Sequence, residues 1–559
     1  MTLSNVPDAL DVVPYPAHLA RAYRESGMWR PYTIAGELKL VAARQPDTLA
    51  VVTAAERITY RELDRRADRF AVALRRLGLE PGDPVVFQLA NEVHTVVAYY
   101  GVLRAGLIPI CSLAQHRERE IGYLIRHTAA RAHLVEAEFR DYDLPGFAAS
   151  LAAEHGNVHT IVVCGGPAGT GQHAYETLIE GVDPDEAAAE VATWRIDPES
   201  VAVFQLSGGT TGDPKVIPRL HCEYAYNARA WGQFWDWGPG SVVLHAAPMM
   251  HNAGVIVAVQ SAHLTGATLV LVPRIDVKTI VEAVATERVT DTMMGLGLMT
   301  RIAEHPELDT FDFSSLRRVF FAPSIPAAGD QAEELFGCTV VPLFGAGEGI
   351  FLTAPDDAPE HVRKGTCGAP LSPLDEIRVL VPGTEEETPV GEIGELTARG
   401  PYTIHGYFRA PERNRDAFTG DGFYRTGDLT RAHVIGGVTY YSHEGRITDN
   451  ISRGGEKIHA DELEALLLRH PAVAEVSVVG MPDRLLGEKV CAFVRPAGDW
   501  APTVADLAKF LFDLGLAKYK LPERVEIVDD LPRTKVGKVS KRDLRTRIAE
   551  TLERERANG

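Results

Sequence analysis

The chain has 559 residues, of which 45% are hydrophobic and 24% are charged, a balance typical of a folded globular protein and not of a disordered or collagen-like one. Its 57 Lys and Arg against 76 Asp and Glu give a net charge of −19. Because like charges repel, this charge disfavours nucleic acids and anionic membranes as partners.

The cysteines and the apolar stretches indicate the compartment. Six cysteines are widely spread without C-x-x-C spacing, so we expect free thiols in a reducing environment. The chain does not begin with a basic segment followed by an apolar run, so no secretory signal is visible. The apolar stretch 253–273 is interrupted by Gln260 and His263, which favours core elements over a membrane span. The sequence therefore predicts a cytoplasmic protein.

The first 190 residues or so alternate helical and strand patterns. Apolar side chains recur at helical spacing at Leu63, Ala67, Phe70, Ala71 and Leu74, which predicts an amphipathic helix. The run DPVVFQLA that follows is typical of a buried strand. Such alternation predicts an α/β fold, with parallel sheets covered by helices on both faces.

The pattern changes twice towards the C-terminus. Residues 376–441 consist of short β runs separated by glycines, which predicts an antiparallel, barrel-like subdomain. The polar segment 444–458 is followed by a new helix (DELEALLLRHPAV) and strand (EVSVVGMP). We therefore expect a large N-terminal domain over 1–445, a hinge at 446–450 and a small, mobile α+β domain over 451–559.

The last 55 residues carry 13 Lys and Arg against 10 Asp and Glu, unlike the acidic remainder. This basic segment is either a solvated face or part of a lid that brings a cation to an anionic ligand.

A Gly/Ser/Thr-rich loop follows the apolar run VAVFQ. In LSGGTTGDPK the glycines leave the backbone free to wrap around an anion, the hydroxyls can donate hydrogen bonds, and the lysine supplies positive charge. These residues are Ser207, Gly208, Gly209, Thr210, Thr211, Gly212 and Lys215. The loop is not a Walker A motif. By itself it fits either a phosphate-binding loop or a glycine-rich surface turn.

Six further motifs accompany this loop in a fixed order. The series is TYREL from Thr59, LSGGTTGDPK from Leu206, FGAGEG from Phe344, GELTARGPYTIHGYF from Gly394, YRTGDL from Tyr424, GRITDNISRGGEKI from Gly445 and LPRTKVGK from Leu531. From about residue 30 onward the chain resembles the adenylate-forming superfamily, which includes acyl-CoA synthetases, nonribosomal peptide adenylation domains and firefly luciferases. The segment YRESGMWR and the His251-Asn252 pair are most similar to its free-standing aryl-acid branch, whose members activate 2,3-dihydroxybenzoate or salicylate.

The resemblance implies a first half-reaction that joins a carboxylate to the α-phosphate of ATP and releases pyrophosphate. One anion attacks another in this step, so the protein must neutralise charge and hold the two reacting groups in line. Lys538 matches the catalytic lysine between carboxylate and α-phosphate, Glu348 the Mg²⁺ ligand, Asp428 the ribose ligand and Arg446 a nucleotide contact. The implied ATP site also includes Leu343, Phe344 and Gly345, with Phe344 stacked on adenine.

The second half-reaction implied by the family transfers the acyl group to a pantetheine thiol. The small domain rotates about a hinge residue, for which the family has Asp or Lys and this chain has Thr448. Gly454 and Gly455 would line the pantetheine tunnel, where glycine permits close approach, and Lys457 lies on the same face. No carrier domain follows Lys538, so the acceptor is expected to be a separate carrier protein or, alternatively, free CoA.

The acid site is implied by the His251-Asn252 pair. His251 would stand beside the reacting carboxylate. Amino-acid-activating relatives have aspartate in place of Asn252, where it pairs with the ammonium of their substrate. A neutral amide can bind an ortho hydroxyl or a ring heteroatom but cannot satisfy a buried ammonium. The pair therefore favours an aromatic acid over an amino acid.

The chain departs from the aryl-acid pattern at four positions of this site. Ala253 stands where tyrosine is usual, Val257 where a polar residue is usual, and Gly347 where a larger residue is usual. Phe321 lies in a segment expected to read Gly-Gly-Ala-Lys. We therefore expect a monocyclic aromatic or heteroaromatic acid that is substituted differently from 2,3-dihydroxybenzoate.

Two alternatives stay open. An aryl-CoA ligase would share the first half-reaction and differ only in the acceptor. A catalytically idle nucleotide-binding scaffold would need no acid, but the complete set Lys215, Glu348, Asp428, Arg446 and Lys538 disfavours it.

Overall fold

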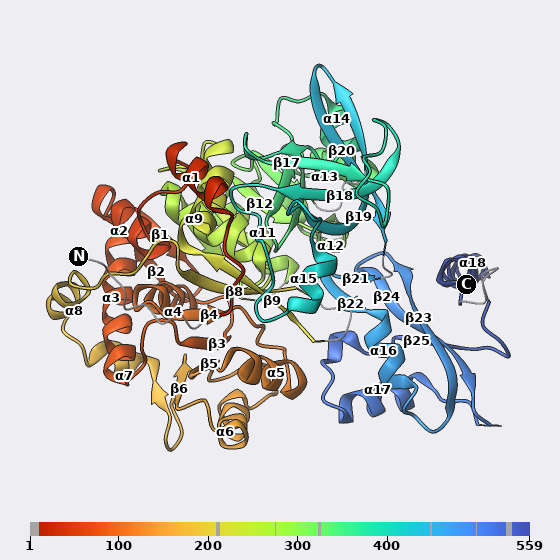
Figure 1. Ribbon diagram of the computed structural model, residues 1–559, viewed down its shortest axis with the longest axis horizontal. Coiled ribbons are helices and arrows are strands. Elements are labelled where there is room, and N and C mark those ends of the chain that lie inside the picture. The colour runs from red at the N-terminus through yellow and green to blue at the C-terminus, as the bar shows by residue number, and fades with distance from the viewer. Residues whose placement is uncertain are drawn as a thin grey trace.

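The computed structural model describes residues 10–207, 213–273, 276–303, 305–321, 326–447, 450–498, 500–532 and 539–558. A large body carries the elements up to β20, and a smaller C-terminal part carries those from β21 onward (Figure 1). The predicted α/β fold, with a large N-terminal domain of parallel sheets and a smaller C-terminal domain, is confirmed.

A seven-stranded sheet runs in the order β7-β6-β5-β3-β4-β8-β9. Its strands are β3 (Pro84–Gln88), β4 (Ile108–Ile110), β5 (Ala132–Glu136), β6 (Thr160–Cys164), β7 (His173–Ala174), β8 (Val201–Ser207) and β9 (Lys215–Leu220). Neighbours are parallel except β8 and β9. Strand β3 is buried throughout, as DPVVFQLA predicted, because parallel strands are covered on both faces.

A nine-stranded sheet lies beside it in the order β16-β15-β14-β13-β12-β10-β11-β1-β2. Its strands are β1 (Leu49–Val52), β2 (Arg57–Thr59), β10 (Val242–His245), β11 (Thr268–Leu271), β12 (Asp291–Met294), β13 (Arg318–Phe321), β14 (Thr339–Ala346), β15 (Ile350–Thr353) and β16 (Ala369–Pro370). Strand β1 pairs in parallel with β11, so the N-terminal segment completes a sheet built from the middle of the chain.

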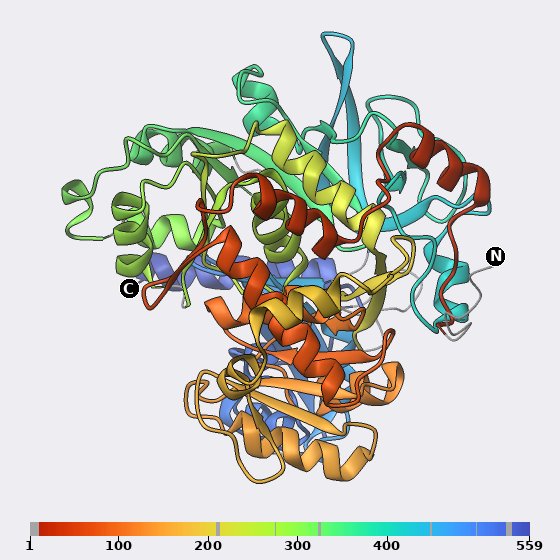
Figure 2. The same cartoon turned by 90° about the vertical axis from the view of Figure 1, so that its left-hand side faces the viewer.

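Helices cover both sheets and fill the space between them (Figure 2). They are α1 (Ala17–Glu25), α2 (Ile34–Arg44), α3 (Tyr60–Arg76), α4 (Val93–Arg104), α5 (Glu118–Thr128), α6 (Leu144–His155), α7 (Tyr175–Glu180), α8 (Pro184–Val191), α9 (His221–Phe234), α10 (Ser261–Thr265), α11 (Val277–Thr286), α12 (Leu296–Ala303), α13 (Pro326–Phe336) and α14 (Glu360–Gly365). The five apolar positions predicted for α3 are all fully buried. The Thr59 hydroxyl caps this helix by accepting from the Glu62 N–H.

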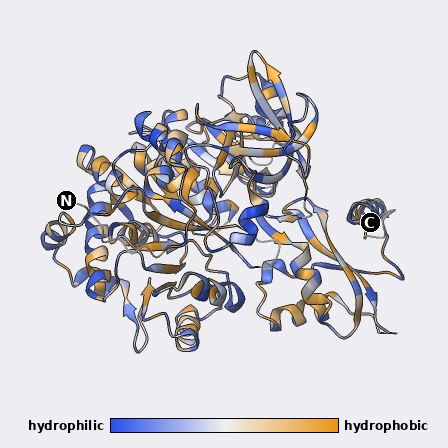
Figure 3. Ribbon diagram, viewed as in Figure 1, coloured by the Kyte–Doolittle hydropathy of each residue, from blue (hydrophilic) through white to orange (hydrophobic). Residues whose placement is uncertain are grey.

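The β-rich stretch is an antiparallel sheet in the order β17-β18-β19-β20. It comprises β17 (Glu376–Leu380), β18 (Ile393–Arg399), β19 (Tyr424–Ile435) and β20 (Val438–Arg446), and the short helix α15 (Pro411–Ala417) precedes β19. The β19–β20 hairpin projects from the body in two views (Figures 1 and 2). Gly436 and Gly437, both at positive φ, form its tight turn. Figure 3 shows α15 as strongly hydrophilic.

The C-terminal part has its own sheet and its own core. It comprises β21 (Asn450–Arg453), β22 (Glu456–His459), α16 (Ala460–Leu467), β23 (Val473–Asp483), β24 (Gly487–Pro496), α17 (Val504–Asp513), β25 (Arg524–Ile527) and α18 (Lys541–Asn558). The predicted helix and strand correspond to α16 and β23. Helix α18 lies on the side away from the body (Figure 1).

The stretch 253–273 forms core elements, as predicted. It contains the π-helical segment η1 (Gly254–Gln260), α10 and β11. Among the described residues, no helix is long and apolar enough to cross a membrane. All six cysteines are free thiols, and all except Cys338 are buried, which confirms the prediction of free thiols.

Candidate active site

Seven of the predicted site residues lie outside the described part of the chain. They are Gly208, Gly209, Thr210, Thr211, Gly212, Thr448 and Lys538. The described residues on either side of the glycine-rich loop, Ser207 and Lys215, face each other across the β8–β9 ladder.

A lysine, a tyrosine and a glutamate form a chain of hydrogen bonds beside this loop. Lys215 Nζ donates to the Tyr407 hydroxyl at 3.4 Å, and that hydroxyl donates to Glu348 Oε1 at 2.8 Å. The Lys215 ammonium also lies 5.1 Å from the centre of the Tyr407 ring. Two residues predicted from separate motifs, the loop lysine and the acidic residue of FGAGEG, therefore share one hydroxyl group.

Strand β14 and its tight connection to β15 place Glu348. Leu343 is buried, and Gly345 pairs with Phe351 in the β14–β15 ladder. Gly349 has φ +101°, and a Cβ there would lie 1.8 Å from the Tyr402 carbonyl oxygen, so only glycine fits. The Glu348 carbonyl accepts from the Ile404 N–H at 2.9 Å. The backbone around Glu348 is therefore held from both sides.

Glu348 suits a magnesium ion as a single protein ligand. It is 3% exposed, and its Oε1 already accepts from Tyr407. In the described residues no group of three or more His, Cys, Asp or Glu could hold a metal ion. Mg²⁺ is commonly held by one or two carboxylates together with substrate phosphate oxygens. The donor set thus fits a magnesium ion that arrives with a nucleotide.

The residues predicted to bind the nucleoside gather next to β14. The rings of Phe344 and His443 are 6.0 Å apart, and His443 Nε2 lies 3.2 Å from Asp428 Oδ1. Asp428 on β19 is in register with Arg446 on β20, so the base of the projecting hairpin brings two predicted residues opposite each other. His443 was not predicted.

Asn252 stands next to the phosphate-side residues. A Cβ added to Gly347 would lie 3.1 Å from Ile217 Cδ1 and 3.9 Å from Asn252 Cβ. Asn252 is 8% exposed, and its Oδ1 accepts from the Tyr224 hydroxyl of α9 at 2.8 Å. Because Gly347 directly precedes Glu348, the predicted acid site and the predicted metal ligand are adjacent.

A buried arginine supports this region from behind. Arg219 forms an ion pair with Glu223 in which both side chains are fully buried. Its Nη1 donates to the Gly347 carbonyl at 2.7 Å and its Nη2 to the Tyr402 carbonyl at 2.9 Å. Burial opposes the charge, but the negative charge of Glu223 outweighs it and raises the pKa of Arg219. The guanidinium therefore stays charged and fixes two segments of the site.

His251 is oriented as a hydrogen-bond donor. Its Nδ1 accepts from the Ala253 N–H at 3.3 Å, which leaves the proton of the neutral ring on Nε2. Although His251 is exposed to solvent, the protein atoms around it, followed by the positive charge of Lys457, lower its pKa. The ring is therefore neutral near pH 7.

The start of η1 positions the next two predicted residues. A Cβ at Gly254 would lie 2.5 Å from the Met249 carbonyl oxygen, so glycine allows the chain to turn tightly after His251. Ala253 is partly buried, and Val257 is 3% exposed. Both pack in the core that also contains Tyr224.

Phe321 is not brought together with these residues. It packs in a different apolar cluster, with Val340, whereas its neighbour Phe320 packs against Trp231 and Trp237 on the side of α9. Successive side chains of a strand point to opposite faces of the sheet. Phe321 and Phe320 therefore point to opposite faces of the sheet, and Phe320 is the one that shares a core with Tyr224 and Val257.

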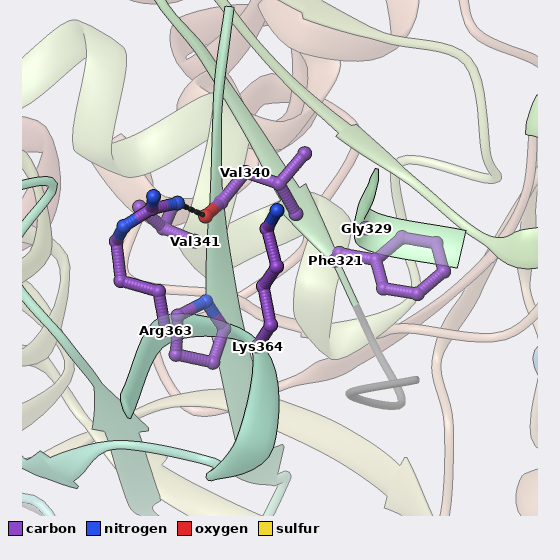
Figure 4. Close-up of a pocket in the computed structure, with 7 residues that line it drawn as sticks. Phe321, Gly329, Val340, Val341, Arg363 and Lys364 are labelled. Carbon is purple, nitrogen blue, oxygen red and sulfur yellow. Dashed lines mark hydrogen bonds between the residues drawn. The ribbon is translucent and has the colours of Figure 1, made fainter. Parts of the chain in front are cut away.

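Phe321 instead borders a small cavity (Figure 4). The cavity has a volume of about 10 Å³, the lower limit for one water molecule. Its lining residues are Phe321, Gly329, Val340, Val341, Pro342, Arg363 and Lys364. Both cations are engaged in ion pairs, for example with Glu333. This cavity cannot hold an aromatic acid.

The β21–β22 hairpin of the C-terminal part faces the body. Its turn contains Gly454 and Gly455, both at positive φ. Glu456, the first residue of β22, accepts from Gln115 Nε2 at 3.2 Å. The next residue, Lys457, is close enough to His251 to affect its pKa. Of the predicted thiol-transfer residues, Lys457 is the one whose charge reaches His251.

A cluster of charges joins the two parts at helix α5. Lys520 Nζ lies 3.1 Å from Glu462 Oε2 within the C-terminal part and 3.4 Å from Glu120 Oε1 of the body. Arg119 Nε of the body lies 3.5 Å from Glu462 Oε1. Both glutamates are buried, with side-chain exposures of 2% for Glu120 and 0% for Glu462. These ion pairs stabilise the observed orientation.

Sequence reasoning missed Tyr407, His443, Tyr224 and Arg219. Tyr407 lies inside the motif GELTARGPYTIHGYF, and Arg219 lies shortly after the glycine-rich loop. Their positions in or near motifs could have indicated that they belong to the site. Their partners could not be predicted, because each acts through a residue distant in the sequence.

Comparisons with known proteins agree with this geometry. Residues 38–408 match the family described as AMP-binding enzyme, and residues 462–538 match the AMP-binding enzyme C-terminal domain. The chain is 37% identical over 543 residues to the 2,3-dihydroxybenzoate-AMP ligase of Bacillus subtilis, covering 96% of this chain and 98% of that one.

Two further proteins are similar over nearly the whole chain. A salicylyl-CoA synthase / salicylate adenylyltransferase of Streptomyces sp is 38% identical, covering 95% of this chain and 97% of that protein. The apo structure of MbtA from Mycobacterium smegmatis has 34% sequence identity and a TM-score of 0.73, covering 96% of this chain and 98% of that one. The resemblance found in the seven motifs is confirmed.

Proposed function

The chain belongs to the AMP-binding enzyme family, and we propose that it activates an aromatic carboxylic acid in two steps. ATP and the acid form an acyl-adenylate with release of pyrophosphate. The acyl group then passes to the pantetheine thiol of a separate carrier protein. The family uses ATP and Mg²⁺, and relatives named as aryl-acid ligases span nearly the whole chain.

The adjacency of Asn252 and Glu348 through Gly347 is the observation that carries the proposal. An acid bound at Asn252 would lie next to the group that holds the metal and the phosphates. Lys215 and the Tyr407 hydroxyl add positive charge and a donor on the same side. Fixed charges and dipoles aimed at the reacting groups lower the barrier to attack of one anion on another. Bound Mg²⁺ would neutralise phosphate charge.

Further residues would complete the first step. Phe344 and Asp428 would bind adenine and ribose, with His443 holding the Asp428 carboxylate. The neutral His251 would donate from Nε2 to the acid's carboxylate without adding a charge. Lys538, assigned from its motif alone, would bridge the carboxylate and the α-phosphate.

For the second step, the observed orientation of the small part supports transfer to a thiol. Gly454 and Gly455 offer backbone without side chains in the turn of the hairpin that carries Lys457, and Lys457 acts electrostatically on His251. A pantetheine arm needs a narrow route that glycine can border closely. Since the six cysteines are free thiols, we place the enzyme in the cytoplasm.

Acid-dependent exchange of pyrophosphate into ATP tests the proposal. The panel is benzoate, hydroxybenzoates, aminobenzoates and picolinate, with an α-amino acid such as phenylalanine as the control. Exchange with an aromatic acid and none with phenylalanine is expected. Exchange with no aromatic acid would contradict the proposal and support an idle scaffold. Supplying the activated acid with either a carrier protein or free CoA then distinguishes an aryl-carrier ligase from an aryl-CoA ligase.

A further inference from the structure

The side chain that sets the direction of the Asn252 amide lies behind it, on helix α9. The Tyr224 hydroxyl donates to Asn252 Oδ1 at 2.8 Å. Among the described residues, nothing accepts a hydrogen bond from Asn252 Nδ2, which is not enclosed by protein. The amide therefore keeps its oxygen towards Tyr224 and can offer its N–H₂ group to a ligand.

Tyr224 is itself held in one position. Its side chain is fully buried, and the Arg219 guanidinium lies 4.3 Å from the centre of its ring. Arg219 in turn is fixed by Glu223 and by the Gly347 carbonyl. Burial raises the pKa of the Tyr224 hydroxyl well above its ordinary value, so the hydroxyl keeps its proton at physiological pH.

The described residues offer that proton one acceptor. The buried Gln205 side chain influences the Tyr224 hydroxyl and lowers its pKa, but Gln205 Nε2 forms no hydrogen bond with a described residue. A tyrosine hydroxyl has a single proton to donate, and the printed bond of this hydroxyl goes to Asn252. Asn252 Oδ1 is the acceptor that receives it.

We propose that Tyr224 is a positioning residue that makes Asn252 a hydrogen-bond donor to the substrate, so that the enzyme prefers acids with a hydrogen-bond acceptor ortho to the carboxylate. This inference rests on the proposed activation of an aromatic acid at Asn252. A phenolic oxygen or a ring nitrogen satisfies the requirement. The oxygen of salicylate qualifies because its own proton is directed to the neighbouring carboxylate.

An ortho amine does not satisfy it. The nitrogen lone pair of anthranilate is delocalised into the ring, and the N–H that does not face the carboxylate points outward. That N–H would meet the Asn252 N–H, and neither donor would find an acceptor. A buried polar group without a partner is costly, and selection against a mismatched hydrogen-bond pattern can be strong.

The test compares salicylate, anthranilate and benzoate in pyrophosphate exchange with the wild-type enzyme and with Tyr224→Phe. The wild type is expected to favour salicylate over anthranilate by at least about tenfold in kcat/KM. In Tyr224→Phe the Asn252 amide is free to turn its oxygen to the ligand, and this ratio is expected to fall by about tenfold. Benzoate, which has no ortho group, should change by less than about twofold.

Two more variants make the test specific. Tyr226→Phe removes another hydroxyl from the same helix, one that pairs with Ser372 Oγ at 2.8 Å, and should leave the ratio unchanged. Gln205→Met removes the polar side chain that influences the Tyr224 hydroxyl and should lower the ratio in the same direction. It also keeps the inference testable if Tyr224→Phe does not fold.

Three results would overturn the inference. The ratio could stay constant in both folded variants, all three acids could lose activity by the same factor, or the wild type could favour anthranilate. If the wild type activates no member of the panel, the proposed function fails as well. That result is distinguishable because it is seen before any variant is made.

Discussion

Replacing Arg119 by alanine should slow thiol transfer and leave adenylate formation unchanged. Arg119 on α5 pairs across the two parts with Glu462, whose side chain is fully buried, whereas the Arg119 side chain is 27% exposed. The variant removes one contact of the orientation that brings Lys457 to His251. Glu462 keeps its second cation, Lys520, so the small part should stay folded.

The size of the effect follows from the exposure of the pair. Two unit charges at 3.5 Å attract strongly in a dry interior, but partial exposure of Arg119 reduces the net contribution to about 1 kcal/mol. A change of 1.4 kcal/mol is about tenfold in an equilibrium constant, so we expect the equilibrium constant for the observed orientation to fall about fivefold. The rate of thioester formation should fall by up to the same factor.

The assay separates the two half-reactions. Pyrophosphate exchange reports adenylate formation, and single-turnover transfer from preformed acyl-adenylate to a pantetheine thiol reports the second step. Arg126→Ala is the control, because Arg126 is an exposed arginine two turns further along α5, and both rates should stay within about twofold. Equal losses in both half-reactions, or no loss in transfer, would refute the idea that this ion pair favours the transfer orientation.

Four other changes should have separable effects. Lys538→Ala should lower pyrophosphate exchange by about 10²–10³-fold while ATP binding, measured by calorimetry, persists; unchanged exchange would remove Lys538 from the reaction. Asn252→Asp should lower kcat/KM for the native acid by at least about tenfold, because a second buried negative charge faces the carboxylate; an unchanged value would mean that the ring does not touch this residue. Tyr407→Phe removes the hydroxyl between Lys215 and Glu348 and should raise the Mg²⁺ concentration needed for half-maximal exchange; an unchanged Mg²⁺ dependence would contradict this role. Burial lowers the pKa of both His133 and His221 to about 3, so the unfolded state binds more protons below about pH 6.5, and the urea midpoint should fall between pH 7 and pH 5; a constant or rising midpoint would contradict it.

Local patterns were enough to predict individual elements. Helical spacing predicted α3, and an apolar run predicted β3, because burial of one face or of a whole strand leaves a periodic trace in the sequence. The pairing of β1 with β11 leaves no such trace. It joins segments more than 200 residues apart, and either strand could have paired elsewhere without a change in its own pattern.

The candidate site shows the same difference between features that local sequence predicts and features that tertiary contacts decide. The roles of Lys215, Glu348 and Asp428 were predicted from motifs that resemble those of the adenylate-forming superfamily, and they stay predictions. The residues that hold them in place act through tertiary contacts, such as the Tyr407 hydroxyl on Glu348. The face of Phe321 could not be predicted, because a one-residue step along a strand reverses the face and register cannot be read from a single strand.

In the proposed site, the backbone around Glu348 is held by groups other than those assigned to the acid. Arg219 binds the carbonyl oxygens of Gly347 and Tyr402, and Gly349 lets the chain pass directly under Tyr402. The backbone on both sides of Glu348 is therefore fixed by groups that do not contact the acid. A side chain can change at Ala253 without moving that backbone. This arrangement explains how the chain can depart from the aryl-acid pattern at the ring while it keeps the residues that the adenylation step requires.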